Sequence, residues 1–234
     1  MQEKTLTGGR SYYLDIARTI AIISISLNHA VNRTYDNYFG QMEEFLESSY
    51  LSSLLKSVAT VFSHLGVPLF LMISGALLLH KRMETADDVK RFYRHNLLEL
   101  FITAEIWYFI MYWFVFFDGI SSGYWEAGLA DTLLGCVKTM LFLDQITMSS
   151  MWYMPMILCL YTTIPFAAML VKKLSLKALS LPLLLAFLYG MCLPALNSLL
   201  VLRDIPPMDT AVHLFNLCSI YYLYVFVGYF ISQG

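Results

Sequence analysis

The stretch from Asn96 to Phe117 reads NLLELFITAEIWYFIMYWFVFF, and its only acidic or basic residues are Glu99 and Glu105. As an α-helix these residues rise about 33 Å, enough to cross the roughly 30 Å hydrocarbon core of a bilayer. A helix also satisfies its own backbone polar groups, as a segment surrounded by lipid must do. The stretch therefore predicts a membrane-spanning helix.

Five further apolar tracts on either side of this one are long enough to span a bilayer. They cover about 14–31, part of 57–79, about 152–171, about 178–201 and about 211–231. Residues 128–143 are apolar on one face but contain Asp131 and Lys138, so they predict an interfacial or re-entrant helix. The sequence thus predicts an all-α, polytopic membrane helical bundle with about six transmembrane helices.

The composition of the whole chain agrees with this prediction. Of its 234 residues, 58% are hydrophobic and 14% are charged, and the mean hydropathy is +0.61. A soluble domain carries about 45–50% apolar and about 25% charged residues. These values exclude a disordered protein and a secreted disulfide scaffold, and the net charge of −2 excludes a conventional nucleic-acid binder. We expect a lipid bilayer as the surroundings and no nucleic-acid partner.

The basic residues are distributed unevenly between the two sides of these tracts. If the N-terminus is cytoplasmic, the cytoplasmic segments contain ten of the fifteen basic residues, and the external loops contain only Arg33, Lys56, Lys138 and Arg203. Cytoplasmic loops of membrane proteins carry an excess of Lys and Arg. We therefore expect a multi-pass protein of the cell membrane with a cytoplasmic N-terminus.

The first tract, LDIARTIAIISISLNHAV, contains three ionisable residues that lipid disfavours: Asp15, Arg18 and His29. Asp15 and Arg18 are three residues apart, so a helix lets them pair on one face. Arg18 and His29 are eleven residues apart, which returns almost to the same azimuth and separates them by about 16 Å. The alternative is a structural ion pair and a histidine at a helix end, where Ser26 and Asn28 bond to a neighbouring helix.

Arg91 and Arg94 precede the third tract at the spacing R-x-x-R, which places them on one face of a helix. Two guanidinium groups there are suited to bind phosphate oxygens in bidentate fashion. The alternative is that they only anchor the cytoplasmic end of the helix. Glu105 lies near the middle of the same tract, where it orients a histidine, stays protonated, or forms an internal hydrogen bond.

Metal and thiol chemistry are not indicated by the spacing of the remaining residues. The histidines outside the first tract and the charged segment before the third show no metal-ligand pattern, so we expect no metal; they are His64, His80 and His213. The four cysteines lie in or beside apolar tracts, and we interpret them as small core residues: Cys136, Cys159, Cys192 and Cys218.

Four motifs occur in an order and spacing that match a known family. Leu14–His29 contains Arg-x10-His, and Val67–Gly75 (VPLFLMISG) is similar to V-P-F-F-x-x-S-G. Arg91–Arg94 matches R-x-x-R, and Met151–Pro155 (MWYMP) is similar to the W-Y opening of a later span. With these motifs the chain resembles the acyltransferase-3 family of integral membrane acyltransferases.

The resemblance implies a bundle of about ten transmembrane helices, which at about 20 residues each need a longer chain than this one. The present sequence matches the N-terminal two-thirds of that pattern. We therefore expect a single membrane domain over residues 1–234 that is incomplete at its C-terminus.

The resemblance also implies transfer of an acyl group, with acetyl expected, from cytoplasmic acyl-CoA to a hydroxyl or amine of an extracytoplasmic acceptor such as a cell-surface glycan. It implies that His29 is the catalytic histidine and that Arg18 belongs to the same site. Arg91 and Arg94 would then contact the phosphates of the donor. The candidates for a carboxylate that orients the histidine are Asp15, Asp36 and Glu105.

Two other functions are consistent with polar residues in a line through a helical bundle. One is a transporter-like domain for a small solute such as an amino acid, and the other is a non-catalytic module that binds a partner. Neither the acceptor nor the oligomeric state is specified by the sequence.

Overall fold

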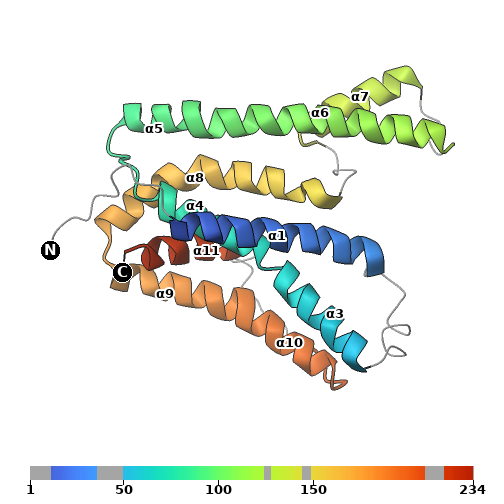
Figure 1. The fold of residues 1–234 in the computed structure, drawn as a ribbon. Helices are drawn as coiled ribbons and strands as arrows, with labels where there is room; N and C mark the ends of the chain where they lie inside the picture. The colour runs from blue at the N-terminus through green and yellow to red at the C-terminus, as the bar shows by residue number, and fades with distance from the viewer. Residues whose placement is uncertain (1–11, 36–49, 124–127, 144–148, 209–218, 234) are drawn as a thin grey trace. The chain divides into compact units, whose positions relative to one another are not determined.

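The computed structural model describes residues 12–35, 50–123, 128–143, 149–208 and 219–233. These described residues are mostly helical, and they contain no strand. The chain divides into two compact units, one made of residues 1–80 and 174–234 and the other of residues 81–173. Figure 1 shows the helices of each unit.

The first unit is built around α4 (Gly66–Leu78), which contacts both α1 (Tyr12–Tyr35) and α11 (Ser219–Ile231) (Figure 1). Its other helices are α3 (Tyr50–Ser63), α9 (Leu176–Phe187), the π-helix η3 (Leu188–Cys192) and α10 (Leu193–Val201). A turn at residues 64–65 separates α3 from α4, so the helix bends within the second predicted tract.

Two glycines allow α4 and α11 to pack at backbone distance. A methyl group added at Gly75 would overlap the backbone of Val225, and one added at Gly228 would overlap the backbone of Met72. Each helix therefore has a glycine in contact with the backbone of the other helix. Small residues at such crossings are typical of membrane helices, where close van der Waals packing drives association.

The second unit is dominated by one continuous helix of 36 residues from Ala86 to Ser121. It comprises α5 (Ala86–Phe92), the π-helix η1 (Tyr93–Leu97) and α6 (Leu98–Ser121), and it is accompanied by α7 (Leu129–Met140), the 3-10 helix η2 (Ser149–Trp152) and α8 (Tyr153–Lys173). At about 54 Å it exceeds the roughly 30 Å hydrocarbon core, so its ends extend beyond the lipid tails.

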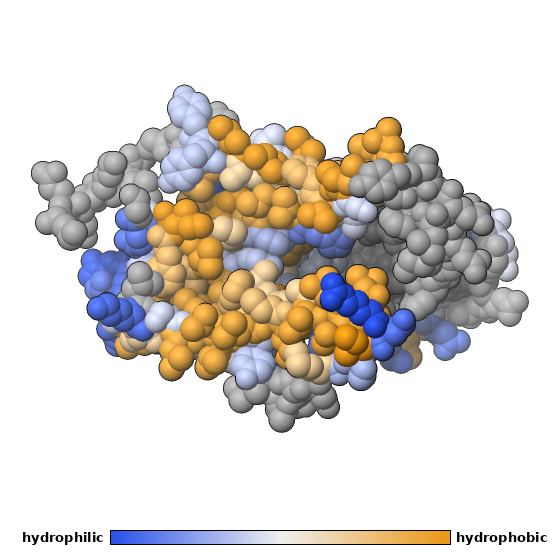
Figure 2. All heavy atoms as spheres, turned by 90° about the horizontal axis from the view of Figure 1, so that it is seen from below, coloured by the Kyte–Doolittle hydropathy of each residue, from blue (hydrophilic) through white to orange (hydrophobic). Residues whose placement is uncertain are grey.

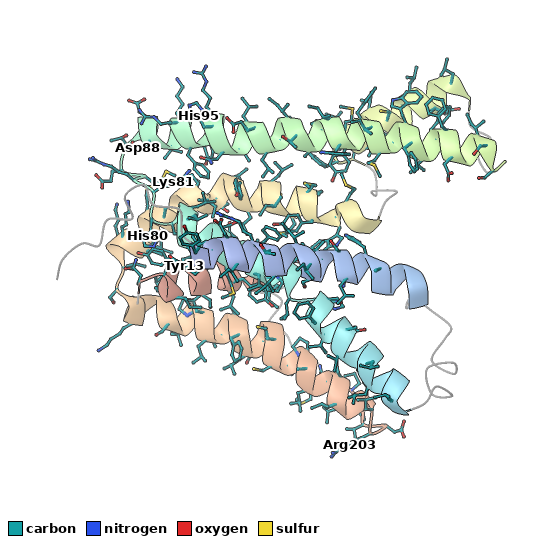
Figure 3. The ribbon with its side chains drawn as sticks, in the orientation of Figure 1. Tyr13, His80, Lys81, Asp88, His95 and Arg203 are labelled. Atoms are coloured by element: carbon teal, nitrogen blue, oxygen red, sulfur yellow. The ribbon has the colours of Figure 1, made fainter. Side chains whose placement is uncertain are left out.

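The helix begins ten residues earlier than the apolar tract because a capping box starts it. The Thr85 hydroxyl accepts a hydrogen bond from the backbone N–H of Asp88 at 3.2 Å, and the Asp88 carboxylate accepts one from the N–H of Thr85 at 3.0 Å. These two bonds satisfy backbone donors of the first turn. Figure 3 labels Asp88 at this start of the helix and Lys81 on the segment that leads to it.

Four helices are long and apolar enough to cross a membrane, and they overlap the predicted second to fifth tracts: Ser57–Leu78, Ala86–Ser121, Tyr153–Lys173 and Lys177–Val201. Helix α1 has 24 residues but is not among these four, and the sixth tract is represented by the shorter Ile220–Ile231 because residues 209–218 lie outside the described part. The fold is therefore an all-α membrane helical bundle, as predicted.

The exposed sides of the helices have the character of a lipid-facing surface. Ile22 is 56% exposed, Phe114 62% and Leu181 63%, each on a different helix. Figure 2 shows hydrophobic side chains over much of the visible face. Apolar patches of this extent are rare on soluble monomers, so the bilayer accounts for them.

Candidate functional site

Helix α1 holds Asp15 and Arg18 together in its first turns. The guanidinium Nη1 of Arg18 donates to Oδ1 of Asp15 at 2.7 Å, and the side chains keep 41% and 31% of their exposure. The predicted pairing on one face is confirmed. The pair offsets the cost of placing either charge near lipid.

Arg18 and His29 lie on the same side of one uninterrupted helix. Eleven residues turn through about three full turns and rise about 16 Å, so the two side chains differ by only about 20° in azimuth. The packed face of α1 lies next to this line, because Ala21 and Ser24 are fully buried. His29 itself is exposed. The helix thus presents a cation and an imidazole beside its contact with the rest of the unit.

The continuity of α1 also narrows the choice of carboxylate for His29. Asp15 lies fourteen residues before the histidine, which is about 21 Å along the axis, and this distance excludes a hydrogen bond between them. Asp15 is therefore not the orienting carboxylate, and its role is to pair with Arg18. Asp36 lies outside the described residues.

A hydrogen-bond network fixes α1 against the end of α3, through Ser24 and through Asn28, the residue just before His29. The hydroxyl of Ser24 donates to the backbone carbonyl of Phe62 at 2.7 Å and lies 3.0 Å from that of Ser63. The side-chain amide of Asn28 donates to the Ser63 hydroxyl at 3.2 Å. Asn28 thus bonds to a neighbouring helix, as the structural alternative for this tract predicted, and the backbone around His29 is held in place.

His64 ends this network at the turn between α3 and α4. Its Nδ1 lies 2.8 Å from the backbone carbonyl of Thr60, so this nitrogen carries the hydrogen. The ring is therefore bonded to its own preceding turn.

The basic residues of the second unit differ in whether they are hydrogen-bonded within the protein. Lys81 donates to Oδ1 of Asn96 at 3.0 Å, and Lys172 donates to the Lys81 carbonyl at 3.0 Å. Partial burial lowers the pKa of Lys81 from its ordinary value. Arg91 and Arg94, in contrast, show no ion pair or hydrogen bond to any described residue. Their guanidinium groups are available to a ligand.

The two arginines lie in different helical segments. Arg91 belongs to α5, whereas Arg94 lies within η1, where each residue turns through a smaller angle than in an α-helix. The hydroxyl of Tyr93 donates to the backbone carbonyl of Thr162 at 2.7 Å and joins η1 to α8. Beside this bond lies a groove, and of the two arginines Arg94 lines it whereas Arg91 does not.

The groove has a volume of about 560 Å³ and runs between η1–α6 and α8. Its walls are almost entirely apolar and include Leu98, Phe101, Leu158 and Phe142. We refer to it as the Arg94 groove. All of its lining residues belong to the second unit.

Phe142 lines the groove in an unusual backbone conformation. Its φ of 55° lies in the left-handed region, at the position after the last turn of α7 that glycine commonly occupies. The N–H of Leu143 bonds to the carbonyl of Lys138 at 2.9 Å, which completes a Schellman motif. The ring packs edge-on against Tyr108 with centroids 5.5 Å apart, a contact that offsets the strain.

Residues 11–234 match the family model described as "Acyltransferase domain". The chain belongs to this acyltransferase family. It is therefore a membrane acyltransferase, and the family assignment made from its four motifs is confirmed. No curated protein and no solved structure matches the chain.

The mid-span carboxylate of this acyltransferase is partly buried. Oε1 of Glu105 is enclosed but accepts no hydrogen bond from a described residue, and Nε1 of Trp113 on the same helix is likewise without a described partner. Glu105 belongs to the second unit and His29 to the first, and its role in orienting His29 stays a prediction. Among the described residues no three His, Cys, Asp or Glu side chains are grouped to hold a metal.

The interpretation of the cysteines needs a correction. Cys136 is buried as predicted, but Cys159 and Cys192 are exposed on helices whose surroundings are apolar. Cys159 lines the Arg94 groove, so the prediction of a core residue is wrong for both exposed cysteines. Cys218 lies outside the described residues. The motifs pointed to neither Phe142 nor the Tyr93–Thr162 bond, although Tyr93 stands inside the R-x-x-R motif itself.

Proposed function

We propose that this protein moves an acyl group, preferentially acetyl, from cytoplasmic acyl-CoA to a hydroxyl or amine of an extracytoplasmic acceptor, namely a cell-surface glycan. The protein would lie in the cell membrane with its N-terminus in the cytoplasm. Membership of the acyltransferase family supports acyl transfer in general. The uneven distribution of basic residues supports the orientation.

The observation that carries this proposal is the unbroken helix α1, with Arg18 and His29 on one side. The pantetheine arm of coenzyme A is about 15–20 Å long, comparable with the rise of about 16 Å between these residues. A donor whose nucleotide stays on the cytoplasmic side can therefore bring its thioester to the depth of His29.

His29 would act as the general base. A neutral ring nitrogen removes the proton from the acceptor hydroxyl, the oxygen attacks the thioester carbon, and the carbon–sulfur bond breaks. The departing thiolate of coenzyme A then takes a proton. Transient acylation of His29 followed by transfer to the acceptor is the covalent version of the same reaction.

Arg91 and Arg94 would bind the diphosphate and the 3′-phosphate of the donor. Support comes from their lack of described partners, whereas Lys81 and Lys172 are engaged within the protein. Guanidinium groups suit phosphate because they offer paired donors. This role predicts donor binding that weakens as salt is raised.

Inverted membrane vesicles test the proposal, because their outer face is the cytoplasmic face. Labelled acetyl-CoA added outside should yield acetylated acceptor within the vesicles. A transporter would instead give uptake of a solute such as an amino acid with no acylated product. Uptake without acylation would overturn the enzymatic function.

A further inference from the structure

The Arg94 groove combines an apolar wall with one basic side chain. Its walls are apolar from Leu98 to Phe101 on one side and at Leu158 on the other, and its charged residue is Arg94. Arg94 lies at the end of the long helix where Lys90 and Arg91 also occur, whereas Phe101 lies about 10 Å further along. The groove therefore runs from a basic end of the span toward its apolar middle.

The apolar walls exclude a polar occupant. The pantetheine arm of the donor carries two amides and a hydroxyl, and each polar group buried without a hydrogen-bond partner costs free energy. The hydroxyls near the groove have no hydrogen left to donate to the pantetheine carbonyls, because Tyr93 donates to the carbonyl of Thr162 and the Thr162 hydroxyl donates to the carbonyl of Cys159 at 2.6 Å. A hydrocarbon chain needs no such partners.

We propose that the groove binds one anionic phospholipid, with its phosphate on the guanidinium of Arg94 and an acyl chain along Leu98, Phe101 and Leu158. Basic residues between transmembrane helices attract anionic headgroups, and each is worth about 1 kcal/mol near the surface. The volume of about 560 Å³ lies within the range of ligand pockets. Phe142, whose ring packs on Tyr108, also lines the groove.

This site has a consequence for catalysis that rests on the proposed function. If Arg94 also contacts the donor, the lipid phosphate and a phosphate of acyl-CoA compete for it. The anionic lipid content of the membrane would then set the apparent affinity for the donor.

Native mass spectrometry of the purified full chain tests the site without requiring activity. Phosphatidylglycerol and phosphatidylcholine with the same acyl chains are added in separate titrations. We expect one retained phosphatidylglycerol, bound about fivefold more tightly than phosphatidylcholine, which corresponds to about one arginine contact. Equal retention of the two lipids would overturn the proposal.

Matched variants separate the groove from a general surface effect. Arg94→Gln should remove the preference, whereas Arg91→Gln should keep it, because Arg91 does not line the groove. Cys159→Trp should block the chain while leaving Arg94 in place; Cys192→Trp, at another exposed cysteine, should not. Loss of the preference in Arg91→Gln would show a nonspecific surface charge and contradict the site.

A different occupant would also be visible. If palmitoyl-CoA is retained by the wild type and lost in Cys159→Trp while phosphatidylglycerol is never retained, the groove binds the acyl chain of the donor instead. Retained phosphatidylglycerol without any acyl transfer in vesicles would leave the lipid site standing and remove only the proposed function.

Discussion

At the residue scale, Arg18 forms an ion pair with Asp15 and lies on the same side of α1 as His29. The 2.7 Å bond between Arg18 and Asp15 fixes the guanidinium in the first turns of α1. A pairing role and a catalytic role make different predictions. Exchanging the two charges keeps an ion pair, whereas it removes the cation from position 18, where a catalytic site would need it.

Asp15→Arg and Arg18→Asp should each lower the free energy of unfolding by about 1 kcal/mol, as expected for a half-exposed ion pair. Each change places two like charges three residues apart. The double variant restores opposite charges and should recover more than half of that loss in a denaturant titration in mixed micelles. If the double variant is as unstable as the sum of the two, the pairing contributes nothing.

The same double variant should remain poor in acyl transfer although it is folded. Its cation then stands at position 15, about 4.5 Å along the axis from its original place and on a different azimuth. Full recovery of transfer in vesicles would show that Arg18 serves only the ion pair.

At the element scale, the crossing of α4 and α11 depends on glycines that have no room for a methyl group. Gly75→Ala and Gly228→Ala should each lower the free energy of unfolding by about 1–3 kcal/mol, because the helix backbones must separate. Gly190→Ala is the matched control, since the nearest side-chain atoms lie 4.0 Å from the added methyl. Thermal unfolding of the three variants checks this, and equal midpoints would contradict the packing.

The contact between α6 and α7 offers a rescue experiment. A methyl at Gly135 would collide with the hydroxyl of Tyr112, which donates to the backbone carbonyl of Thr132 at 2.8 Å. Gly135→Ala should therefore be destabilising, and Tyr112→Phe should cost about 1 kcal/mol through the lost hydrogen bond. The double variant should lose less unfolding free energy than the sum of the losses in the two single variants. Strict additivity would mean that the two helices do not meet there.

How far the sequence predicts the helices depends on which physical signal marks each end. The long helix was predicted from about residue 96, where apolar residues begin, but a capping box at Thr85 and Asp88 starts it earlier within a charged segment that hydropathy does not register. The π-turn at Tyr93–Leu97 escapes prediction because a pattern with a period of 3.6 does not reveal one inserted residue.

The candidate site was predictable to a similar degree. The Asp15–Arg18 pair follows from local spacing, and the structure shows it. The contact of Gly75 with Val225 and the groove between η1–α6 and α8 join residues far apart in the chain, and a single sequence carries no local signal of such contacts. The catalytic and donor-binding roles of His29, Arg18, Arg91 and Arg94 stay predictions.

At the scale of the whole molecule, the distribution of basic residues predicts which loops face the cytoplasm. Single cysteines at Glu84 and Arg203, in a chain whose native cysteines are replaced by serine, should react on opposite sides with a membrane-impermeant maleimide. The cysteine at position 84 should be labelled in inverted vesicles and that at 203 in intact cells. Labelling of both from one side would contradict the orientation.

The most direct test of the central claim is the rate of acyl transfer by His29→Ala. In inverted vesicles supplied with labelled acetyl-CoA, loss of the general base should lower the rate by at least about 100-fold while the protein stays inserted. His64→Ala is the matched control, because that ring is bonded to its own turn, and its rate should stay close to that of the wild type. An inserted His29→Ala protein that transfers acyl groups at the rate of the control would contradict the account.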